Sequence, residues 1–330
     1  MTSSPHIKSP TPDFAFVVPV GPGPHPWLRH SLRSLAAQSS IVAVAICAVE
    51  DSPDLQDVLT EFSDIIRYIR IGPDGGQSDA INEGWSAIHA RYYGWLNDDD
   101  ILHPDATSRA MHAFTQTDAD VVHGHTHILD HETIRFGYGG DAVGPALMRD
   151  NILAQPSTFI ARAALLAVDL DTPGTLTIPV DPDRHFTMDW DLWQRLYLSG
   201  AKFQAIPDTL SITRWYDGTK TAAPGLRKYK EYFSLMKRGG FGPRAVWAMI
   251  NIALHNGATY GRARAQFSTI KSGLLRVKTQ TATVTTAPTL DVFHYEDHPV
   301  FLMTPNEPVL APGESRQLAL DAISFGAPPL

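Results

Sequence analysis

The sequence predicts an α/β fold in which a mostly parallel central sheet is flanked by helices. Short apolar runs alternate with segments of helical spacing over about the first two thirds of the chain, which is the pattern of such folds. Several runs are apolar throughout, as in strands covered on both faces. Acidic or glycine-rich segments follow their ends. Ligands of α/β proteins bind beyond the carboxyl ends of the strands, so these segments mark a candidate site.

The first four apolar runs are expected to form buried strands with helices between them. In the first helix, Leu28, Leu32 and Leu35 make one apolar stripe. A glycine-rich loop over residues 72–77 precedes the third helix, which Ser78 or Asp79 can cap. The expected strands are 14–20, 41–49, 67–71 and 92–96, and the first two helices are 27–38 and 55–66.

The following region continues with shorter elements. Residues 124–144 contain five glycines and three histidines, so we expect a loop or a hairpin there. The remaining expected helices are 105–115, 162–168 and one near 188–196, and the expected strands are 119–123, 155–160 and 210–214. Beyond them lie a basic segment and a proline-rich tail.

Composition narrows the class of protein. The chain has 330 residues, of which 43% are hydrophobic and 19% are charged, enough for one large globular domain or two smaller ones. Its single cysteine, Cys47, cannot form an internal disulfide and indicates a reducing compartment. Residues 1–12 have no apolar core of a signal peptide, and the apolar run 245–254 is too short to span a bilayer. We expect a cytoplasmic protein, either free or peripheral at the inner face of the membrane.

Charge is distributed unevenly along the chain. Residues 227–278 hold eleven Lys or Arg and one acid, a balance of +10 that leaves −18 for the remainder, since the net charge is −8. Aromatic residues interleave with these basic residues, which favours contact with an anionic membrane. The alternative is a solvated helical face that offsets the acidic remainder. No nucleic-acid-binding module accompanies the charge, so we expect no nucleic-acid partner.

Two acidic sites stand out. Asp98, Asp99 and Asp100 follow directly after the expected strand 92–96, and three adjacent carboxylates repel one another. A divalent cation is the usual compensation, because hard cations bind carboxylate oxygens, although a solvated turn is the commoner reading of an acidic cluster. The second site is Asp189, at the expected N-terminus of a helix, where a carboxylate can also serve only as a cap.

Together these residues resemble the family 2 glycosyltransferases, which have the GT-A fold. The resemblance runs from about residue 14 to residue 221 and is most specific at 73–84 (PDGGQSDAINEG) and 94–100 (GWLNDDD). It implies a bacterial, inverting, metal-dependent glycosyltransferase. Such an enzyme would transfer a sugar from a nucleotide-sugar donor, expected to be a UDP-sugar, to a glycan or lipid-linked acceptor in cell-surface polysaccharide synthesis.

The resemblance also assigns the donor site. Glu50 takes the position of an acid that contacts the base or ribose, and Asp79 that of a second acid near the uracil. Asn97, Asp98 and Asp99 occupy the family's Asp-X-Asp motif, with Asn in the first place. Asp98 would face the ribose, and Asp99 would ligate Mg²⁺ or Mn²⁺ at the diphosphate. The resemblance adds these further donor contacts: Pro19, Val20 and Gly76.

The catalytic base and the acceptor side come from the second part of the match. Asp189 takes the position of the base, and Asp191 is a second candidate. Arg214 and Lys220 match a segment that closes over the diphosphate. Tyr216 stands where relatives carry a histidine that assists the metal or phosphate, so a further protein ligand is in doubt. The expected acceptor side comprises Gln155, Pro156 and Tyr216.

The same resemblance suggests how the chain is divided. We expect a disordered N-terminus over 1–12, a nucleotide-sugar-binding half over 13–124, an acceptor-binding and catalytic half over 125–224, a basic helical extension over 225–280 and a proline-rich tail over 281–330.

Two other functions remain open. A sugar-nucleotide nucleotidyltransferase shares a related architecture but usually begins with a basic glycine-rich loop, and residues 21–24 carry no basic side chain. A catalytically inactive scaffold of the same fold that binds glycan or lipid would fit the Tyr216 substitution. The presence of Asp98, Asp99 and Asp189 argues against it.

Overall fold

The computed structural model describes residues 11–130, 133–140, 142–216, 226–242, 291–295, 298–302 and 315–317. The chain divides into two compact units, Met1–Ala223 with Leu290–Leu330, and Pro224–Thr289. Lys220, residues 1–10 and most of the basic segment 227–278 lie outside the described residues. The boundaries expected from the sequence stay a prediction.

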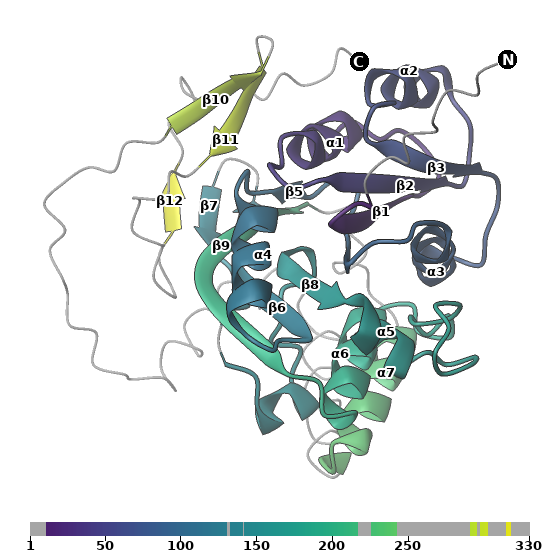
Figure 1. The fold of residues 1–330 in the computed structure, drawn as a ribbon, viewed down its shortest axis with the longest axis vertical. Helices are drawn as coiled ribbons and strands as arrows, with labels where there is room; N and C mark the ends of the chain where they lie inside the picture. The colour runs from purple at the N-terminus through teal and green to yellow at the C-terminus, as the bar shows by residue number, and fades with distance from the viewer. Residues whose placement is uncertain are drawn as a thin grey trace, which may run out of the picture. The chain divides into compact units, whose positions relative to one another are not determined.

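The first half of the main sheet is parallel. Its strands run in the order β4-β1-β2-β3, and each neighbouring pair is parallel. Helices α1 and α2 lie on one side of these strands and α3 on the other (Figure 1). This arrangement confirms the expected α/β fold. The elements are β1 (Phe14–Val20), α1 (Leu28–Ala36), β2 (Val42–Ala48), α2 (Pro53–Glu61), β3 (Ile66–Ile71), α3 (Gln77–Ala87) and β4 (Tyr92–Trp95).

The second half of the sheet is mixed. Strand β8 (Thr158–Ala161) is antiparallel to β4, and β6 (Val121–Asp130) is antiparallel to β8 and parallel to β9 (Phe203–Trp215). Strand β6 pairs with β7 (Thr133–Phe136), so part of residues 124–144 forms a hairpin. The other elements of this unit are β5 (Ile101–Leu102), α4 (Ala106–Gln116), η1 (Pro145–Met148), η2 (Gln155–Ser157), α5 (Arg162–Ala167), α6 (Met188–Leu198), β10 (Asp291–Tyr295), β11 (His298–Leu302) and β12 (Ser315–Gln317).

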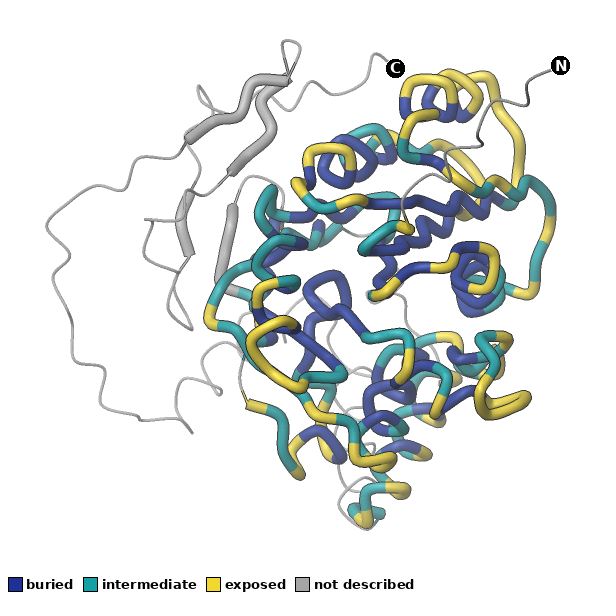
Figure 2. The backbone as a smooth tube through the Cα atoms, viewed as in Figure 1, coloured by how far each residue is buried: buried dark blue, intermediate teal, exposed yellow. Residues whose placement is uncertain are grey.

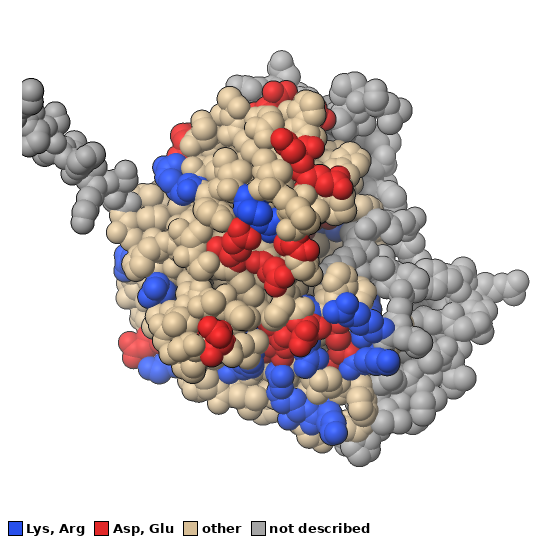
Figure 3. Space-filling model, turned by 90° about the vertical axis from the view of Figure 1, so that its right-hand side faces the viewer, with Lys and Arg blue, Asp and Glu red and all other residues tan. Residues whose placement is uncertain are grey.

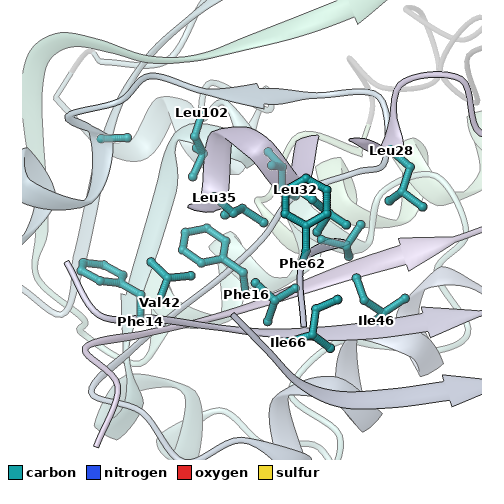
Figure 4. Close-up of a cluster of buried hydrophobic side chains, with 14 of the residues drawn as sticks. Phe14, Phe16, Leu28, Leu32, Leu35, Val42, Ile46, Phe62, Ile66 and Leu102 are labelled. Carbon is teal, nitrogen blue, oxygen red and sulfur yellow. The ribbon is translucent and has the colours of Figure 1, made fainter. Parts of the chain in front are cut away.

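The hydrophobic core lies between the parallel strands and the helices on the α1 side. Phe14 and Phe16 of β1 and Leu32 of α1 are at most 1% exposed, and Figure 4 shows them in one cluster. The Phe14 and Phe159 rings meet edge to face with centroids 5.7 Å apart, which joins β8 to the same core. Burying one such side chain contributes about 1.5–3 kcal/mol. Every residue of β1 and β2 is accordingly buried, as the dark blue tube of these strands in Figure 2 shows.

A glycine allows α3 to pack closely on the opposite side of the sheet. A Cβ atom at Gly84 would lie 2.6 Å from a methyl of Val17 and 3.0 Å from the Cβ of Ala45. A larger residue would push the helix outward. The close packing fixes α3, and therefore the loop that precedes it, against β1 and β2.

The second unit is described only in its first part. Helix α7 (Leu226–Arg238) carries its basic residues among aromatic ones. None of the helices in the described part of the chain has both the length and the apolarity that crossing a bilayer requires.

Candidate active site

The turn after β4 is held by side chains from two other elements. Asn97 accepts a hydrogen bond from Gln77 Nε2 at 2.7 Å, so the start of α3 contacts the turn. Its Nδ2 donates to Asp100 Oδ2 at 3.0 Å and to Gln155 Oε1 at 3.4 Å. Gln155 in turn donates to the carbonyl of Trp95 at 2.6 Å. Residue 97 therefore links the glycine-rich loop to the acceptor-side residues expected from the sequence.

Asp98 is paired with a histidine from the loop after β1. The His25 Nδ1 and Asp98 Oδ2 atoms are 2.5 Å apart. This hydrogen bond is the main reason why the pKa of His25 is raised, and burial opposes the shift. The charge of Glu50, an exposed residue beyond the end of β2, adds to the same shift. Glu50, His25 and Asp98 therefore lie in one electrostatic neighbourhood, at the carboxyl ends of three parallel strands.

The pKa of Asp99 depends on opposing effects, of which burial and a hydrogen bond from Tyr216 are two. The Tyr216 hydroxyl donates to Asp99 Oδ2 at 3.1 Å. Burial and the charge of Asp98 raise the pKa of Asp99, whereas Tyr216 and the charge of Arg214 lower it. Arg214 itself is buried, and burial lowers its pKa to about 10 while Asp100 and Asp99 act in the opposite direction. The end of β9 thus brings a cation and a phenol to the turn after β4.

Asp100 is a buried part of the turn. Its carboxylate is 1% exposed, and burial and the charge of Asp99 hold its pKa well above the usual range. The Arg214 backbone also donates a hydrogen bond to it. Ser31 Oγ of α1 donates to the Asp100 carbonyl at 2.7 Å. Asp100 therefore anchors the turn rather than presenting a free carboxylate.

The glycine-rich loop before α3 is shaped by Arg70. Its guanidinium donates to Asp74 Oδ2 at 2.5 Å and to Glu83 Oε2 at 2.9 Å. Asp74 Oδ1 accepts from the backbone N–H of Gly76 at 2.9 Å. Gly76 has φ +129°, a conformation that side chains other than that of glycine rarely adopt. Asp79, in the first turn of α3, lies against Gly75, where a Cβ would be 2.0 Å from its carboxylate.

The first turn of α6 carries the second acidic site. Asp189 is partly exposed. Its Oδ2 accepts from Asn151 Nδ2 at 2.8 Å, and its Oδ1 accepts from the backbone N–H of Trp190 at 2.7 Å. Asp191 is 1% exposed and accepts from Arg195 Nε at 2.7 Å. The two acids of this helix therefore have different surroundings.

Three contacts tie the start of α6 to the donor half. Ser78 Oγ of α3 is 3.0 Å from the sulfur of Met188, the first residue of α6. The Trp95 ring at the end of β4 stacks on Trp193 of α6, with centroids 5.7 Å apart and an interplanar angle of 16°. Asn82 Nδ2 also donates to the Val180 carbonyl at 2.7 Å, and the Val180 N–H donates back at 2.9 Å. The helix that carries Asp189 is thereby fixed to α3 and β4.

Residues 20–162 match the family model described as glycosyl transferase family 2. This part of the chain is similar to that family. The matched segment contains the Asp98–Asp99 pair, Asp79 and Gln155, whereas Asp189 and Arg214 lie beyond its end.

Curated relatives carry only general names. An uncharacterized glycosyltransferase of Rickettsia bellii is 24% identical over 200 residues, which cover 56% of this chain and 27% of that protein. A second, from Rickettsia felis, is 24% identical over 124 residues, or 36% of this chain and 20% of that protein. The chain thus spans about a quarter of the length of the curated relatives it matches.

Two solved structures also resemble the chain. Residues 1–349 of S. aureus TarS, in complex with UDP-GlcNAc, give a TM-score of 0.48 at 12% identity, covering 69% of this chain and 65% of that one. The mannosyltransferase PcManGT from Pyrobaculum calidifontis, in complex with GDP-Man and Mn²⁺, gives a TM-score of 0.49 at 12% identity and covers 81% of each chain.

The remaining residues expected at the site lie near the ends of two elements. Pro19 and Val20 are buried at the end of β1, where the Val20 carbonyl accepts from the N–H of Val49 at 3.0 Å. Pro156 is buried in η2. The sequence analysis did not single out His25 or Asn151. His25 carries a signal in retrospect, since it lies in the Gly/Pro-rich loop after the first strand.

The acids of the turn suit a divalent cation in part. Within the described residues no three His, Cys, Asp or Glu side chains gather into a metal cluster. Asp98 and Asp99 nevertheless offer hard carboxylate oxygens, the donors that Mg²⁺ and Mn²⁺ prefer. Burial and the like charge of Asp98 both disfavour an ionised Asp99, and a bound cation would offset them. A cation there would take its other ligands from the substrate. Figure 3 shows acidic side chains gathered around the middle of one face of the molecule.

Proposed function

We propose that this chain is an inverting, metal-dependent glycosyltransferase. It would transfer a sugar from a nucleotide-sugar donor, a UDP-sugar in the first instance, to a glycan or lipid-linked acceptor in cell-surface polysaccharide synthesis. The observation that carries the proposal is the linkage of two acidic sites. The Asp98–Asp99 turn and the α6 turn with Asp189 are joined through the Trp95–Trp193 stack and the Ser78–Met188 contact.

The donor half of the proposed site is the parallel half of the sheet. Glu50 and Asp79 contact the base or ribose in this proposal, and Gly76 lets the loop backbone approach the nucleotide. Asp98 faces the ribose, held by its hydrogen bond to His25. Asp99 binds Mg²⁺ or Mn²⁺. The positions of these residues support the roles. All of them follow the carboxyl ends of parallel strands, where ligands bind in such sheets.

When the bond between the sugar and the diphosphate breaks, negative charge develops on the departing nucleoside diphosphate. A bound Mg²⁺ or Mn²⁺ supplies charge stabilisation for that leaving group without any proton transfer. The Arg214 guanidinium is buried beside Asp99 and Asp100 and supplies positive charge from the protein. Buried positive charge acts strongly there because little solvent screens it.

Asp189 acts as the general base in this proposal. Its carboxylate is partly exposed and can accept the proton of an acceptor hydroxyl as that oxygen attacks the anomeric carbon. Hydrogen bonds from Asn151 and from the Trp190 N–H fix the orientation of this carboxylate. Gln155, Pro156 and Tyr216 stay proposed for the acceptor side.

Asp191 receives a structural role instead of a catalytic one. It is buried, and Arg195 holds its carboxylate at 2.7 Å. The same guanidinium donates to the carbonyls of Val168 and Pro179, both at 2.6 Å. These bonds support a role in holding the segment before α6.

The basic segment would bring the site to a lipid-linked acceptor at the inner face of the membrane. In its described part, α7 carries Arg227, Lys228, Lys230, Lys237 and Arg238 against one acid, Glu231. We expect the protein to float with vesicles containing phosphatidylglycerol, to lose that binding at high salt, and to ignore vesicles of phosphatidylcholine alone. Salt-insensitive or absent binding would leave a solvated basic face.

A donor screen tests the proposed activity. Release of nucleoside diphosphate would be measured from a panel of UDP- and GDP-sugars, with and without Mn²⁺, for the wild type and Asp99→Asn. We expect metal-dependent release by the wild type alone. Equal background release by both proteins would contradict the proposal, pyrophosphate release from a nucleoside triphosphate would indicate a nucleotidyltransferase, and donor binding without turnover would indicate a scaffold.

A further inference from the structure

The hydroxyl of Tyr216 is hydrogen-bonded to the acidic turn after β4. The residue lies directly after β9, 117 residues from its partner, and donates to Asp99 Oδ2 at 3.1 Å. A phenol has one hydroxyl proton to donate, and here Asp99 accepts it. The bond occupies one carboxylate oxygen and thereby sets the direction in which the other one points.

The ring of Tyr216 packs against a tryptophan. Trp27, in the segment that enters α1, packs on it with ring centroids 4.7 Å apart and an interplanar angle of 55°. The Arg214 guanidinium lies 5.4 Å from the centre of the same tryptophan ring. Trp27 thus contacts both β9 residues that approach the acids. A flanking ring of this kind limits the rotation of the phenol.

The carboxylate of Asp98 is also held by a hydrogen bond from the segment before α1. Asp98 has His25 as its partner, two residues before Trp27. One short segment, residues 25–27, therefore supports both acids, Asp98 directly and Asp99 through Tyr216. The terminal torsion of an aspartate is soft, so a carboxylate without such partners would sample many orientations.

We propose that Tyr216 is a positioning residue: its hydroxyl, braced by Trp27, holds Asp99 in the orientation that binds a divalent cation. The inference rests on the proposed function in one respect, the cation at Asp99. Hydrogen-bond partners of metal-ligating carboxylates typically contribute 10–100-fold to metal affinity. Loss of the hydroxyl should therefore weaken cation binding without removing the ligand.

The test measures Mn²⁺ binding directly, by the electron paramagnetic resonance signal of free Mn²⁺ during titration of the protein, first alone and then with UDP. We expect the dissociation constant of Tyr216→Phe to rise about tenfold and binding by Asp99→Asn to be lost. Trp27→Leu should raise the constant less. Adding Trp27→Leu to Tyr216→Phe should cost less than the sum of the two single effects, because both act on one bond.

Tyr197→Phe is the matched control, since Tyr197 is a half-buried tyrosine near the other end of α6. It should bind Mn²⁺ as the wild type does. Melting temperatures in EDTA show whether each variant is folded. In turnover, the apparent KM for Mn²⁺ should rise in Tyr216→Phe while kcat returns at excess Mn²⁺, which a general loss of structure would not produce.

The failures are distinguishable. If the wild type binds Mn²⁺ and Asp99→Asn does not, but Tyr216→Phe matches the wild type, the positioning role is wrong and the metal site stands. Tighter binding by Tyr216→Phe would also overturn the inference, because the phenol would then compete with the cation. If the wild type and Asp99→Asn both fail to bind, the metal site and the inference fall together.

Discussion

The turn after β4 and the first turn of α6 each combine an accessible carboxylate with a buried one. Asp98 and Asp189 are partly exposed, whereas Asp100 and Asp191 are each 1% exposed. The buried pair differ in their compensation. Asp191 meets the guanidinium of Arg195, but Asp100 meets the amide of residue 97 and a backbone N–H.

The difference lies in the groups that contact each buried acid. The guanidinium of Arg195 holds the carboxylate of Asp191 at 2.7 Å. Burial is the main cause of the raised pKa of Asp100, and the like charge of Asp99 adds to it, while the hydrogen bonds from Asn97 and the Arg214 backbone only oppose the shift. The acids of one turn therefore have different surroundings, so substitutions at these four positions should have different effects on activity and stability.

The largest effect is expected at the accessible acid of α6. Asp189→Asn keeps the shape of the side chain but removes the proposed base, so kcat should fall by a factor of about 10²–10⁴. Donor binding, followed as the melting-temperature shift caused by UDP and Mn²⁺, should stay unchanged. Wild-type turnover in this variant would mean that another group takes the proton.

Substitution of the buried acid of the same helix should lower the stability of the protein. Asp191→Asn leaves Arg195 without its carboxylate, and breaking a buried ion pair in this way costs about 3–5 kcal/mol. The free energy of unfolding in urea measures it. Asp118→Asn is the control, since its pair with Lys202 is largely exposed and should contribute less than about 1 kcal/mol. Equal losses in the two variants would contradict the assignment.

Removing the side chain that orients Asp189 should have a smaller effect. Asn151→Ala deletes the 2.8 Å bond to the carboxylate. We expect kcat to fall about tenfold, the rate equivalent of one hydrogen bond to a charged group, with little change in the KM for the donor. A proportional loss of melting temperature would instead indicate that Asn151 mainly stabilises the fold.

The smallest effect is expected at Asp100. Asp100→Asn resembles the protonated side chain, so the stability at mildly acidic pH should change by less than about 1 kcal/mol. The raised pKa means that the folded state binds this proton more tightly than the unfolded state. In metal-free buffer the wild type should lose stability relative to Asp100→Asn as the pH rises through that raised pKa. Parallel pH profiles of unfolding would show that Asp100 stays ionised.

The local hydropathy pattern was sufficient to predict most of the strands and helices. Strands β1 and β2 are uninterrupted apolar runs, and the positions of β1 to β4 match the expected ones within about two residues. Strand β5 has only two residues and left no pattern. Strand β6 extends to Asp130 because its second half pairs with β9 and β7. His123 and His127 are buried in it despite being polar, and burial is the main reason why their pKa values are lowered to about 4. No hydropathy pattern indicates such a strand.

The site was predictable as residue types but not as contacts. The acids 98, 99 and 189 stand out because each occurs at the end of an element. Their partners lie far away in sequence, 73 residues for His25 and 117 for Tyr216. Such pairings depend on how the sheet is ordered and how its loops pack. Asn151 is a single amide in an irregular segment, and nothing around it in the sequence marks it as a partner of Asp189.

The tryptophans between the two acidic sites give this protein an optical signal of its own. Trp85 lies edge to face on Trp95, with centroids 5.5 Å apart, and Trp95 stacks on Trp193. Indoles at these separations couple their electronic transitions. The circular dichroism of the near ultraviolet should therefore contain a couplet that disappears when α6 parts from β4. Anyone screening acceptors or variants can follow the integrity of the whole centre without a label.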